Sequence, residues 1–319
     1  MMNKTFTAGV LGGTGYTGRE LIRLIRAHPG LELVFATSEA EAGAPVQGNG
    51  LRYTSAMDAP LGMADVVFSC LPTGESGPWA LRAAGAGALS IDLSADLREG
   101  VAGAEYGLPE LWRERIRGAR LVANPGCYPT GILLGLVPLL AAGLVDGTRP
   151  LIVDAASGVT GAGRSAKRDL LFGEVAEDYR AYGVGNSHRH VPEIAAGLAR
   201  AGTETEFVFT PHLLPIRRGI LATMYVPLVA GVDVGAVAAA LGQAYAGEPF
   251  VEVQEELPSV KDVVGRNVVA LGTSEVRGVS RPLALVVAAF DNLLKGAAGQ
   301  ALQNANLVLG LPEAQGLPQ

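Results

Sequence analysis

The sequence predicts an α/β fold of two domains: a doubly wound parallel sheet, followed by an α+β domain with a mixed sheet. Two observations predict the first domain. A glycine-rich turn joins an apolar strand to a helix near the start of the chain, and further apolar strands then alternate with helical segments. A third observation predicts the second domain, because from about Pro150 the chain reads as strands separated by long polar connections. At 319 residues the chain is long enough for two cores.

Composition excludes several classes of function. The net charge of −6 argues against a nucleic-acid partner, because it leaves no basic stripe for phosphates. The two cysteines, Cys70 and Cys127, do not make a disulfide framework. No apolar run reaches the roughly 20 residues of a membrane-spanning helix, and the first residues lack the apolar core of a signal peptide. We therefore expect a cytoplasmic enzyme without a membrane partner.

The first strand, Thr7 to Leu11, leads through seven residues into a helix from Arg19 to His28. From Gly13 these residues match G-x-G-x-x-G in the strand–loop–helix context of a Rossmann-type dinucleotide site. Such glycines let the backbone turn sharply and approach a pyrophosphate at the helix N-terminus. The residues expected to contact the cofactor here are Gly12, Thr14, Gly15, Tyr16, Thr17 and Gly18.

The second strand, Leu31 to Ala36, ends where a Rossmann-type domain reads the adenosine ribose. Thr37 and Ser38 suit a ribose 2′-phosphate, whereas Glu39 suits an unphosphorylated ribose. The residues alone therefore leave NADP and NAD both open.

A further strand, Asp65 to Pro72, opens at its carboxyl end on a polar loop, and in a doubly wound sheet that end faces the ligand crevice. Leu71 and Pro72 are therefore expected beside the cofactor. Cys70 lies on the strand itself and is expected in the core.

The stretch from Asn124 to Gly131 contains the strongest sign of catalysis. A short strand closes just before it, its Pro-Gly pair forces a turn, and a helical apolar pattern follows from Thr130 to about Ala142. Cys127 is thus expected at or just before a helix N-terminus, where free N–H groups and the helix dipole favour a thiolate. The same N–H groups suit an oxyanion on an attacked carbonyl. The alternative, a small core residue, is disfavoured by the flanking turn residues.

Strands of the second domain are expected over Leu151–Ala155, Glu206–Pro211, Ile220–Leu228 and Pro282–Ala289. The connections between them carry candidate anion ligands. A Gly/Ser loop that ends at Arg164 suits a phosphate or a carboxylate. Adjacent Arg217 and Arg218 either hold an anionic substrate or face solvent.

His188 and His190 alternate on an extended segment and are expected to point to the same side. A metal site is disfavoured, because the chain offers no Cys or acidic cluster at ligand spacing. One imidazole as the acid/base partner of Cys127 is favoured, although spacing does not decide which.

Asp291 or Asn292 is expected to cap a last helix that runs to about Leu309 and packs on the first domain. The tail after Leu311 is expected to be loosely held. The expected domains are therefore residues 1–146 with 292–319 for the dinucleotide, and residues 147–291 for catalysis and dimerisation.

Six motifs occur in an order that resembles one family. They are Gly-Gly-Thr-Gly-Tyr-Thr-Gly at 12–18, Asn-Pro-Gly-Cys-Tyr-Pro-Thr at 124–130, Ser-Gly-Val-Thr-Gly-Ala-Gly-Arg at 157–164, His-Arg-His-Val-Pro-Glu-Ile at 188–194, Arg-Gly-Ile at 218–220 and Asp-Asn-Leu-Leu-Lys-Gly-Ala-Ala-Gly-Gln at 291–300. Over nearly its whole length the chain resembles the N-acetyl-gamma-glutamyl-phosphate reductase family, of the aspartate-semialdehyde dehydrogenase and glyceraldehyde-phosphate dehydrogenase type.

The resemblance implies NADPH-dependent reduction of N-acetyl-L-glutamyl 5-phosphate to N-acetyl-L-glutamate 5-semialdehyde in arginine biosynthesis, with release of phosphate, by a homotetramer. Cys127 would form a thioester, and His190, chosen over His188, would move the proton. The other residues implied are Asn124, Arg164, His188 and Arg218 for the substrate, and Ser157, Gly158 and Asn292 for the cofactor.

Two positions depart from this family's pattern. Glu39 stands where members often carry Arg, which bears on the choice of NADP, and Thr73 stands where they often carry His. One alternative is the same chemistry on a carrier-linked aminoadipyl phosphate of lysine biosynthesis. Tyr128-Pro129 disfavours it, because those relatives tend to have Asn-Ala there. A non-catalytic dinucleotide-sensing regulator would leave Cys127 and the histidine pair unexplained.

Overall fold

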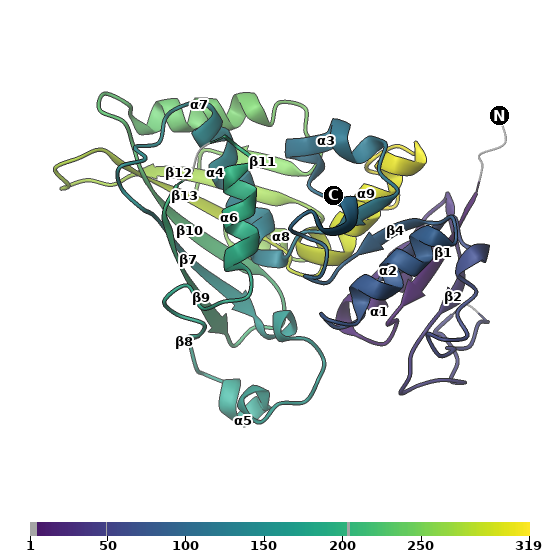
Figure 1. Ribbon diagram of the computed structural model, residues 1–319. Coiled ribbons are helices and arrows are strands. Elements are labelled where there is room, and N and C mark those ends of the chain that lie inside the picture. Colours follow the sequence, from purple (N-terminus) through teal and green to yellow (C-terminus); the bar gives the residue numbers. More distant parts are fainter. Residues whose placement is uncertain (1–4, 49, 203–204) are drawn as a thin grey trace. The chain divides into compact units, whose positions relative to one another are not determined.

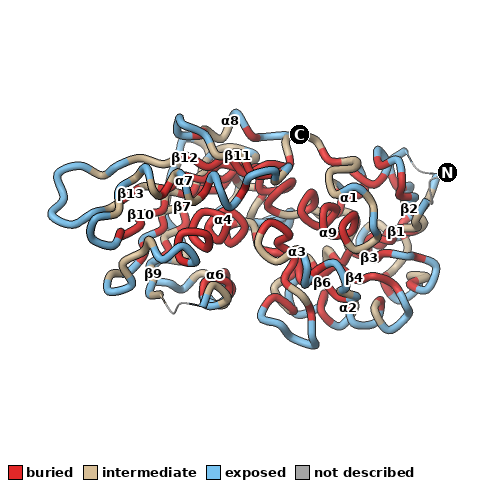
Figure 2. The backbone as a smooth tube through the Cα atoms, turned by 90° about the horizontal axis from the view of Figure 1, so that it is seen from above, coloured by how far each residue is buried: buried red, intermediate tan, exposed pale blue. Residues whose placement is uncertain are grey.

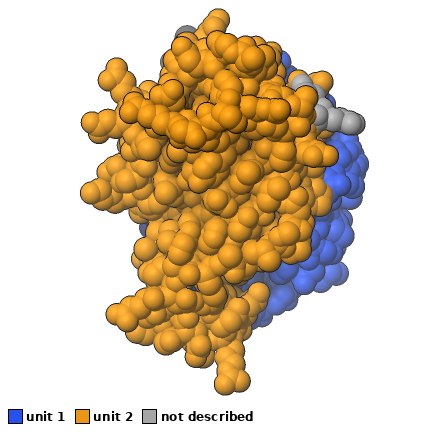
Figure 3. Space-filling view, turned by 90° about the vertical axis from the view of Figure 1, so that its left-hand side faces the viewer, with its two compact units in different colours: residues 1–126, 297–318 blue, residues 127–296, 319 orange. Residues whose placement is uncertain are grey.

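The computed structural model describes residues 5–48, 50–202 and 205–319. The chain divides into two compact units: unit 1 holds residues 1–126 and 297–318, and unit 2 holds residues 127–296 and 319 (Figure 3). Each unit carries one sheet (Figure 1). Within the described residues, no helix combines the length and the apolar character needed to cross a membrane.

Unit 1 is built on a six-stranded sheet in the order β2-β1-β3-β4-β6-β5, in which every pair is parallel. The chain reverses its winding between β1 and β3, the switch point at which such sheets bind ligands. The strands are β1 (Phe6–Leu11), β2 (Leu31–Ala36), β3 (Val66–Ser69), β4 (Leu89–Asp92), β5 (Glu105–Tyr106) and β6 (Leu121–Ala123). The helices are α1 (Tyr16–Ala27), α2 (Ser76–Gly85), α3 (Pro109–Arg117) and α9 (Gly299–Leu309), with 3-10 turns at Leu61–Met63 and Val101–Gly103. The predicted doubly wound parallel sheet is confirmed.

Helix α9 is buried along almost its whole length, as Figure 2 shows. It packs against α1, α3 and β4 of the same unit. Its inward polar side chains need partners, because an unpaired buried amide is costly. Asn304 Nδ2 donates to the Gly107 carbonyl at 2.9 Å and to Asn124 Oδ1 at 3.2 Å. The end of β6 is therefore fastened to α9.

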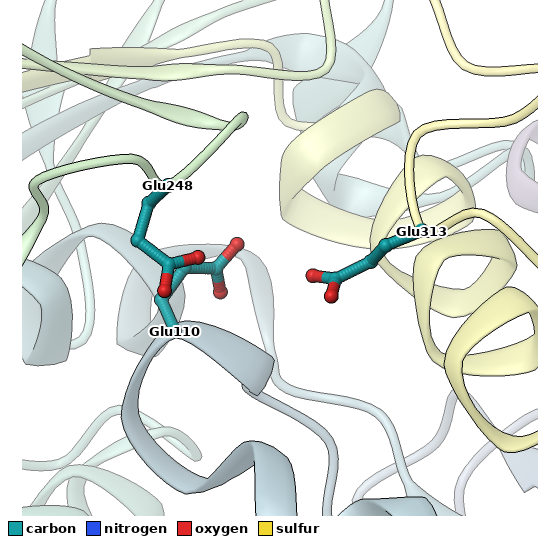
Figure 4. A group of neighbouring side chains, drawn as sticks. All are labelled: Glu110, Glu248 and Glu313. Carbon is teal, nitrogen blue, oxygen red and sulfur yellow. The ribbon is translucent and has the colours of Figure 1, made fainter.

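The tail after α9 is held by hydrogen bonds, so the expectation of a loose end is wrong. Asn306 Nδ2 donates to the carbonyls of Glu313 and Gln315 at 3.1 and 2.8 Å. Gln303 Nε2 donates to one carboxylate oxygen of Glu110 and one of Glu313, at 2.7 and 2.8 Å. Figure 4 shows the Glu110 and Glu313 carboxylates pointing toward one another. Polar side chains of α9 thus fix a segment whose own residues give no sign of order.

Unit 2 is built on a seven-stranded sheet in the order β11-β12-β13-β10-β7-β9-β8. The pairs β11–β12 and β7–β9 are parallel and the other pairs are antiparallel, which confirms the predicted mixed sheet. The strands are β7 (Leu151–Gly158), β8 (Arg180–Ala181), β9 (Phe207–Leu214), β10 (Ile220–Pro227), β11 (Val251–Gln254), β12 (Val269–Glu275) and β13 (Leu283–Phe290). The helices are α4 (Cys127–Ala141), α5 (Phe172–Val175), α6 (Val191–Ala199), α7 (Val234–Ala244) and α8 (Val260–Val263), with 3-10 turns at Val159–Ala162 and Arg168–Leu170. A π-helical turn at Leu294–Ala298 begins in unit 2, and its last two residues belong to unit 1.

Helix α4 forms the core of unit 2. It is apolar on every face and buried from Tyr128 to Leu140, as a helix covered on all sides must be. Two glycines let it lie close to the sheet. A Cβ on Gly131 would lie 2.2 Å from the Phe290 ring of β13, and one on Gly135 would lie 2.5 Å from Met224 of β10. Helices α6 and α7 pack beside α4 on this face (Figure 1).

The segment that contains Cys127 differs from the sequence expectation in two ways. Helix α4 begins at Cys127, three residues before the expected start at Thr130. Pro129 lies in the first turn of α4, where backbone N–H groups have no partner within the helix. The N–H group that proline lacks is therefore not needed there, and the helix can begin before the Tyr-Pro pair. Residues 127–146 belong to unit 2 by their contacts, whereas the sequence assigns them to the first domain.

Candidate active site

Cys127 is the first residue of α4, at the end of the helix where backbone N–H groups lack intrahelical partners. It is half-buried and forms no disulfide. Gly296 packs against it, because a Cβ built on that glycine would lie 3.1 Å from Cys127 Cβ. The other free thiol lies in a different setting: burial and the nearby Asp92 raise the pKa of Cys70. Of the two thiols, Cys127 is the one placed for nucleophilic attack.

Cys127 lines a cavity of about 410 Å³ within unit 2, a size that suits a small substrate. The cavity brings together the expected nucleophile and both expected histidines. Its wall also includes Ser157 and Gly158 from the end of β7. The titratable side chains that line it are Cys127, Tyr128, Tyr182, His188, His190, Asp169, Lys167, Arg180 and Arg189.

The two imidazoles lie edge to face, with ring centroids 4.8 Å apart. His188 Nδ1 accepts a hydrogen bond from the backbone N–H of His190 at 3.1 Å. Burial, and secondarily the charge of Arg189, lower the pKa of His188 to about 4. At neutral pH His188 is therefore uncharged, and because Nδ1 accepts, its hydrogen is on Nε2. His190 is buried and immediately precedes α6.

An aromatic cluster holds the His188 ring. Tyr128, Tyr182 and Phe209 make edge contacts with it at centroid distances of 5.6, 5.5 and 5.5 Å. The Tyr128 hydroxyl donates to the His212 carbonyl at 3.2 Å, which leaves its oxygen to accept from the Tyr182 hydroxyl at 3.1 Å. Burial raises the pKa of Tyr182 to about 12, so this pair stays protonated at neutral pH. The sequence does not reveal this cluster, because no spacing links its members.

The cations of the cavity are not the ones singled out from the sequence. Arg164 is exposed and does not line the cavity. Arg180 lines it, but the Asp178 carboxylate engages its guanidinium, which also donates to backbone carbonyls. Lys167 and Arg189 line it as well. The only signal for them in the sequence is that both lie in the long polar connection that ends at the histidine pair.

Arg218 is directed to a buried carboxylate. Its Nε and Nη2 donate to Asp291 Oδ1 at 3.1 and 3.0 Å, and Asp291 is fully buried. The same oxygen accepts from the N–H groups of Leu293 and Leu294 at 2.8 and 3.1 Å, so Asp291 caps the turn that follows. Its Oδ2 accepts from the Gly265 N–H at 2.9 Å. The residue expected to hold a substrate carboxylate thus holds a carboxylate of the protein.

Two asparagines of the expected site use their amides within the fold. Asn292 Oδ1 accepts from the Gly219 N–H at 2.7 Å, and its Nδ2 donates to the Thr160 hydroxyl at 3.0 Å. In unit 1, Asn124 Oδ1 accepts from Asn304 at 3.2 Å. Both asparagines are buried. Their side chains fix backbone segments on which site residues lie.

The glycine loop of unit 1 fits a pyrophosphate. Gly12 has a φ of 76°, which strains any residue with a β-carbon. A Cβ on Gly18 would lie 2.3 Å from the Gly12 carbonyl oxygen, so this glycine lets α1 pack on the loop. At Gly15 the nearest atom to a Cβ is 3.7 Å away, and this is the glycine beside which the fingerprint places the phosphates. The end of the strand that leads to Leu71 and Pro72 lies against Gly12.

The three polar residues after β2 act differently. The Thr37 hydroxyl accepts from the first N–H of the glycine loop at 3.1 Å, so this buried side chain holds the loop in place. The Ser38 and Thr14 hydroxyls are hydrogen-bonded at 3.0 Å. The Glu39 carboxylate accepts from the Ala56 N–H at 2.7 Å. Glu39, expected to suit a ribose hydroxyl, is thus bound to a neighbouring segment of its own unit.

Comparison with known proteins agrees with this architecture. Residues 7–119 match the family described as semialdehyde dehydrogenase, NAD binding domain, and residues 127–292 match semialdehyde dehydrogenase, dimerisation domain. Aspartate semialdehyde dehydrogenase II from Vibrio cholerae, solved with ASA, superposes with a TM-score of 0.77 at 20% identity, over 96% of this chain and 99% of that one. Aspartate semialdehyde dehydrogenase with NADP from Candida albicans gives 0.74 at 17% identity, with the same coverage. Fold and site together define a protein of the semialdehyde dehydrogenase class with an NAD(P)-binding domain.

Relatives with similar sequences indicate which family within the semialdehyde dehydrogenase class the chain belongs to. N-acetyl-gamma-glutamyl-phosphate reductase from Symbiobacterium thermophilum is 44% identical over 98% of this chain and 97% of its own length. The enzyme of the same name from Moorella thermoacetica is 44% identical over 97% of both chains. The chain belongs to the N-acetyl-gamma-glutamyl-phosphate reductase family.

Proposed function

We propose that this protein reduces N-acetyl-L-glutamyl 5-phosphate to N-acetyl-L-glutamate 5-semialdehyde, with NADPH and with release of phosphate, as a step of arginine biosynthesis. The observation that carries the proposal is Cys127 at the first residue of α4, on the wall of a cavity that holds two histidines and three cations. A positioned thiolate and anion-binding side chains are what an acyl phosphate requires. The names of relatives at 44% identity support N-acetylglutamyl as the acyl group.

In the proposed reaction the Cys127 thiolate attacks the C5 carbonyl, the bond from this carbon to the phosphate oxygen breaks, and a thioester and phosphate result. N–H groups at the start of α4 stabilise the oxyanion between these states. NADPH, when bound, supplies the hydride that reduces the thioester carbonyl. His190 gives a proton to the resulting alkoxide and takes it back as the carbon–sulfur bond breaks. The aldehyde leaves and the thiolate is restored.

His188 and two cations are assigned to the substrate. Neutral His188 carries its hydrogen on Nε2 and so donates to a substrate oxygen without adding charge. Lys167 and Arg189 line the cavity, and within the described part of the chain neither is in an ion pair, so we assign them to the phosphate and the carboxylate. The roles of Arg164 and Arg218 stay predictions from the sequence.

We propose that the protein acts as a homotetramer in the cytoplasm. The match of unit 2 to a dimerisation domain supports an assembly through this unit. The proposed mechanism needs a reduced thiol at Cys127, which a reducing compartment maintains.

The reverse reaction tests the proposal. Purified protein receives N-acetyl-L-glutamate 5-semialdehyde, phosphate and NADP+, and formation of the reduced cofactor is followed by absorbance. We expect turnover that requires phosphate and that falls by about a thousandfold or more in Cys127→Ser. Cys70→Ser is the matched control and should keep wild-type turnover, because that thiol is outside the cavity. Wild-type turnover in Cys127→Ser would refute the thioester intermediate. Activity on aspartate semialdehyde together with no activity on N-acetyl-L-glutamate 5-semialdehyde would refute the substrate assignment.

A further inference from the structure

Helix α1 presents Arg19 to the loop that follows β2. Arg19 Nη2 lies 3.5 Å from Glu41 Oε1, and 49% and 36% of the two side chains are exposed. Ser38 fixes the shape of this loop, because its hydroxyl accepts from the Glu41 N–H at 3.2 Å and is hydrogen-bonded to the Thr14 hydroxyl at 3.0 Å. A guanidinium is therefore held at the end of β2, where a Rossmann-type domain reads the adenosine ribose.

Glu39 and Glu41, the acidic residues at this place, both have partners within the protein. A carboxylate that accepts from the ribose 2′-hydroxyl favours NAD, whereas a cation near that position accommodates the 2′-phosphate of NADP. Glu39 accepts from a backbone N–H at 2.7 Å. Glu41 is paired with Arg19. Arg52, a further cation of this loop, donates to a backbone carbonyl at 2.6 Å.

We propose that Arg19 is the residue that selects NADP over NAD, by exchanging Glu41 for the ribose 2′-phosphate when the cofactor binds. The exchange is favourable, because an exposed ion pair contributes little to stability whereas a phosphate accepts two parallel hydrogen bonds from one guanidinium. Thr37 and Ser38 contribute by positioning the backbone, because Thr37 holds the glycine loop in place and Ser38 holds the Glu41 loop. The inference rests on the proposed use of NADPH and adds the side chain that sets this preference.

Calorimetric titration of the resting protein tests it without any turnover. The ligands are NADP+, NAD+, adenosine 2′,5′-bisphosphate and 5′-AMP. Arg19→Ala should weaken the binding of NADP+ and of the bisphosphate by about tenfold or more. It should change the affinity for NAD+ and for 5′-AMP by less than about twofold. Glu41→Gln should tighten NADP+, because it removes the anion that competes for Arg19. Arg23→Ala is the matched control, since Arg23 is exposed on the same helix and pairs with Glu20 at 2.6 Å.

Three outcomes would overturn the inference: wild-type NADP+ affinity in Arg19→Ala, equal losses for NADP+ and NAD+, or a wild type that binds NAD+ more tightly. Arg19→Lys keeps the charge and should recover part of the NADP+ affinity, which a purely structural role would not predict. Because every readout is binding of an adenine nucleotide, a failure to reduce the acyl phosphate would leave these results standing. If the wild type reduces the acyl phosphate and Arg19→Ala leaves the nucleotide affinities unchanged, this inference is refuted and the proposed function is not.

Discussion

Replacing Asp291 by Asn should destabilise unit 2 strongly. The Asp291 carboxylate is fully buried and accepts from two atoms of Arg218 and from the N–H groups of Leu293, Leu294 and Gly265. Asparagine keeps the shape and removes the charge. Arg218, whose side chain is 17% exposed, then faces a neutral amide in place of its carboxylate. The substitution therefore separates an ion pair without changing the volume of the site.

The expected loss follows from the chemistry of those partners. Removing one member of a buried ion pair costs about 3–5 kcal/mol of unfolding free energy, because the other charge stays desolvated. The amide nitrogen of Asn also has to face a backbone N–H or the guanidinium, and an unsatisfied donor costs about 1–3 kcal/mol. The two effects concern the same desolvated groups and do not add. We therefore expect a loss of about 3–5 kcal/mol.

Urea unfolding of a double-mutant cycle provides the assay. The variants are Asp291→Asn, Arg218→Gln and the double variant, with Arg217→Ala as the exposed neighbouring control. We expect a coupling energy of about 2 kcal/mol or more between positions 218 and 291, and a change below about 0.5 kcal/mol for the control. If Arg218→Gln leaves stability unchanged and instead raises the KM for the semialdehyde, Arg218 is a substrate ligand and not a structural partner of Asp291.

Three further predictions address the other parts of the two units. The pKa of His188 lies at about 4 in the folded protein against an ordinary 6.5, so between these values the unfolded chain binds more protons. Stability should therefore fall as the pH drops from 6.5 to 4, and the urea midpoint of His188→Gln should fall less over that range. Gly18→Ala would bring a Cβ to 2.3 Å from the Gly12 carbonyl oxygen, so calorimetry should show NADP+ binding weakened by about tenfold or more. Gly85→Ala is the control and should bind NADP+ normally, because a Cβ at Gly85 would meet open space. Tyr128→Phe removes the hydroxyl that donates to the His212 carbonyl and should cost about 1–2 kcal/mol in thermal unfolding; no shift in Tm would contradict the hydrogen bond described.

Most of the fold is predictable from local sequence patterns. The glycine loop, β1 and β2 are predictable because a buried parallel strand is a short apolar run, and the turn that follows needs glycine at fixed offsets. Cys127 is predictable for a similar reason: Pro125 and Gly126 stop one element and a long apolar run starts the next. In each case the residues that decide the structure lie within a few positions of one another.

Elements without a local signature were missed. Strand β11 (Val251–Gln254) carries only two apolar residues, and its place in the sheet comes from pairing with β12, which itself has a polar second half. The segment after α9 was expected to be loose because it is rich in turn residues. It is ordered by Asn306 and Gln303 of the preceding helix, whose polar side chains are buried. Order at these places depends on partners that a pattern of hydrophobicity does not reveal.

The same limit explains why the chemistry of a site residue is harder to predict than its position. Arg218 and Asn292 were singled out as ligands from their motifs, yet their partners Asp291 and Gly219 each lie 73 positions away in the chain. Removing a guanidinium from a buried carboxylate leaves that charge buried without its partner, whereas a guanidinium beside an exposed carboxylate is available to a phosphate. Arg218 is in the first position and Arg19 is in the second. Because the two side chains are identical, the burial of the partner carboxylate is what distinguishes the roles proposed for these two arginines.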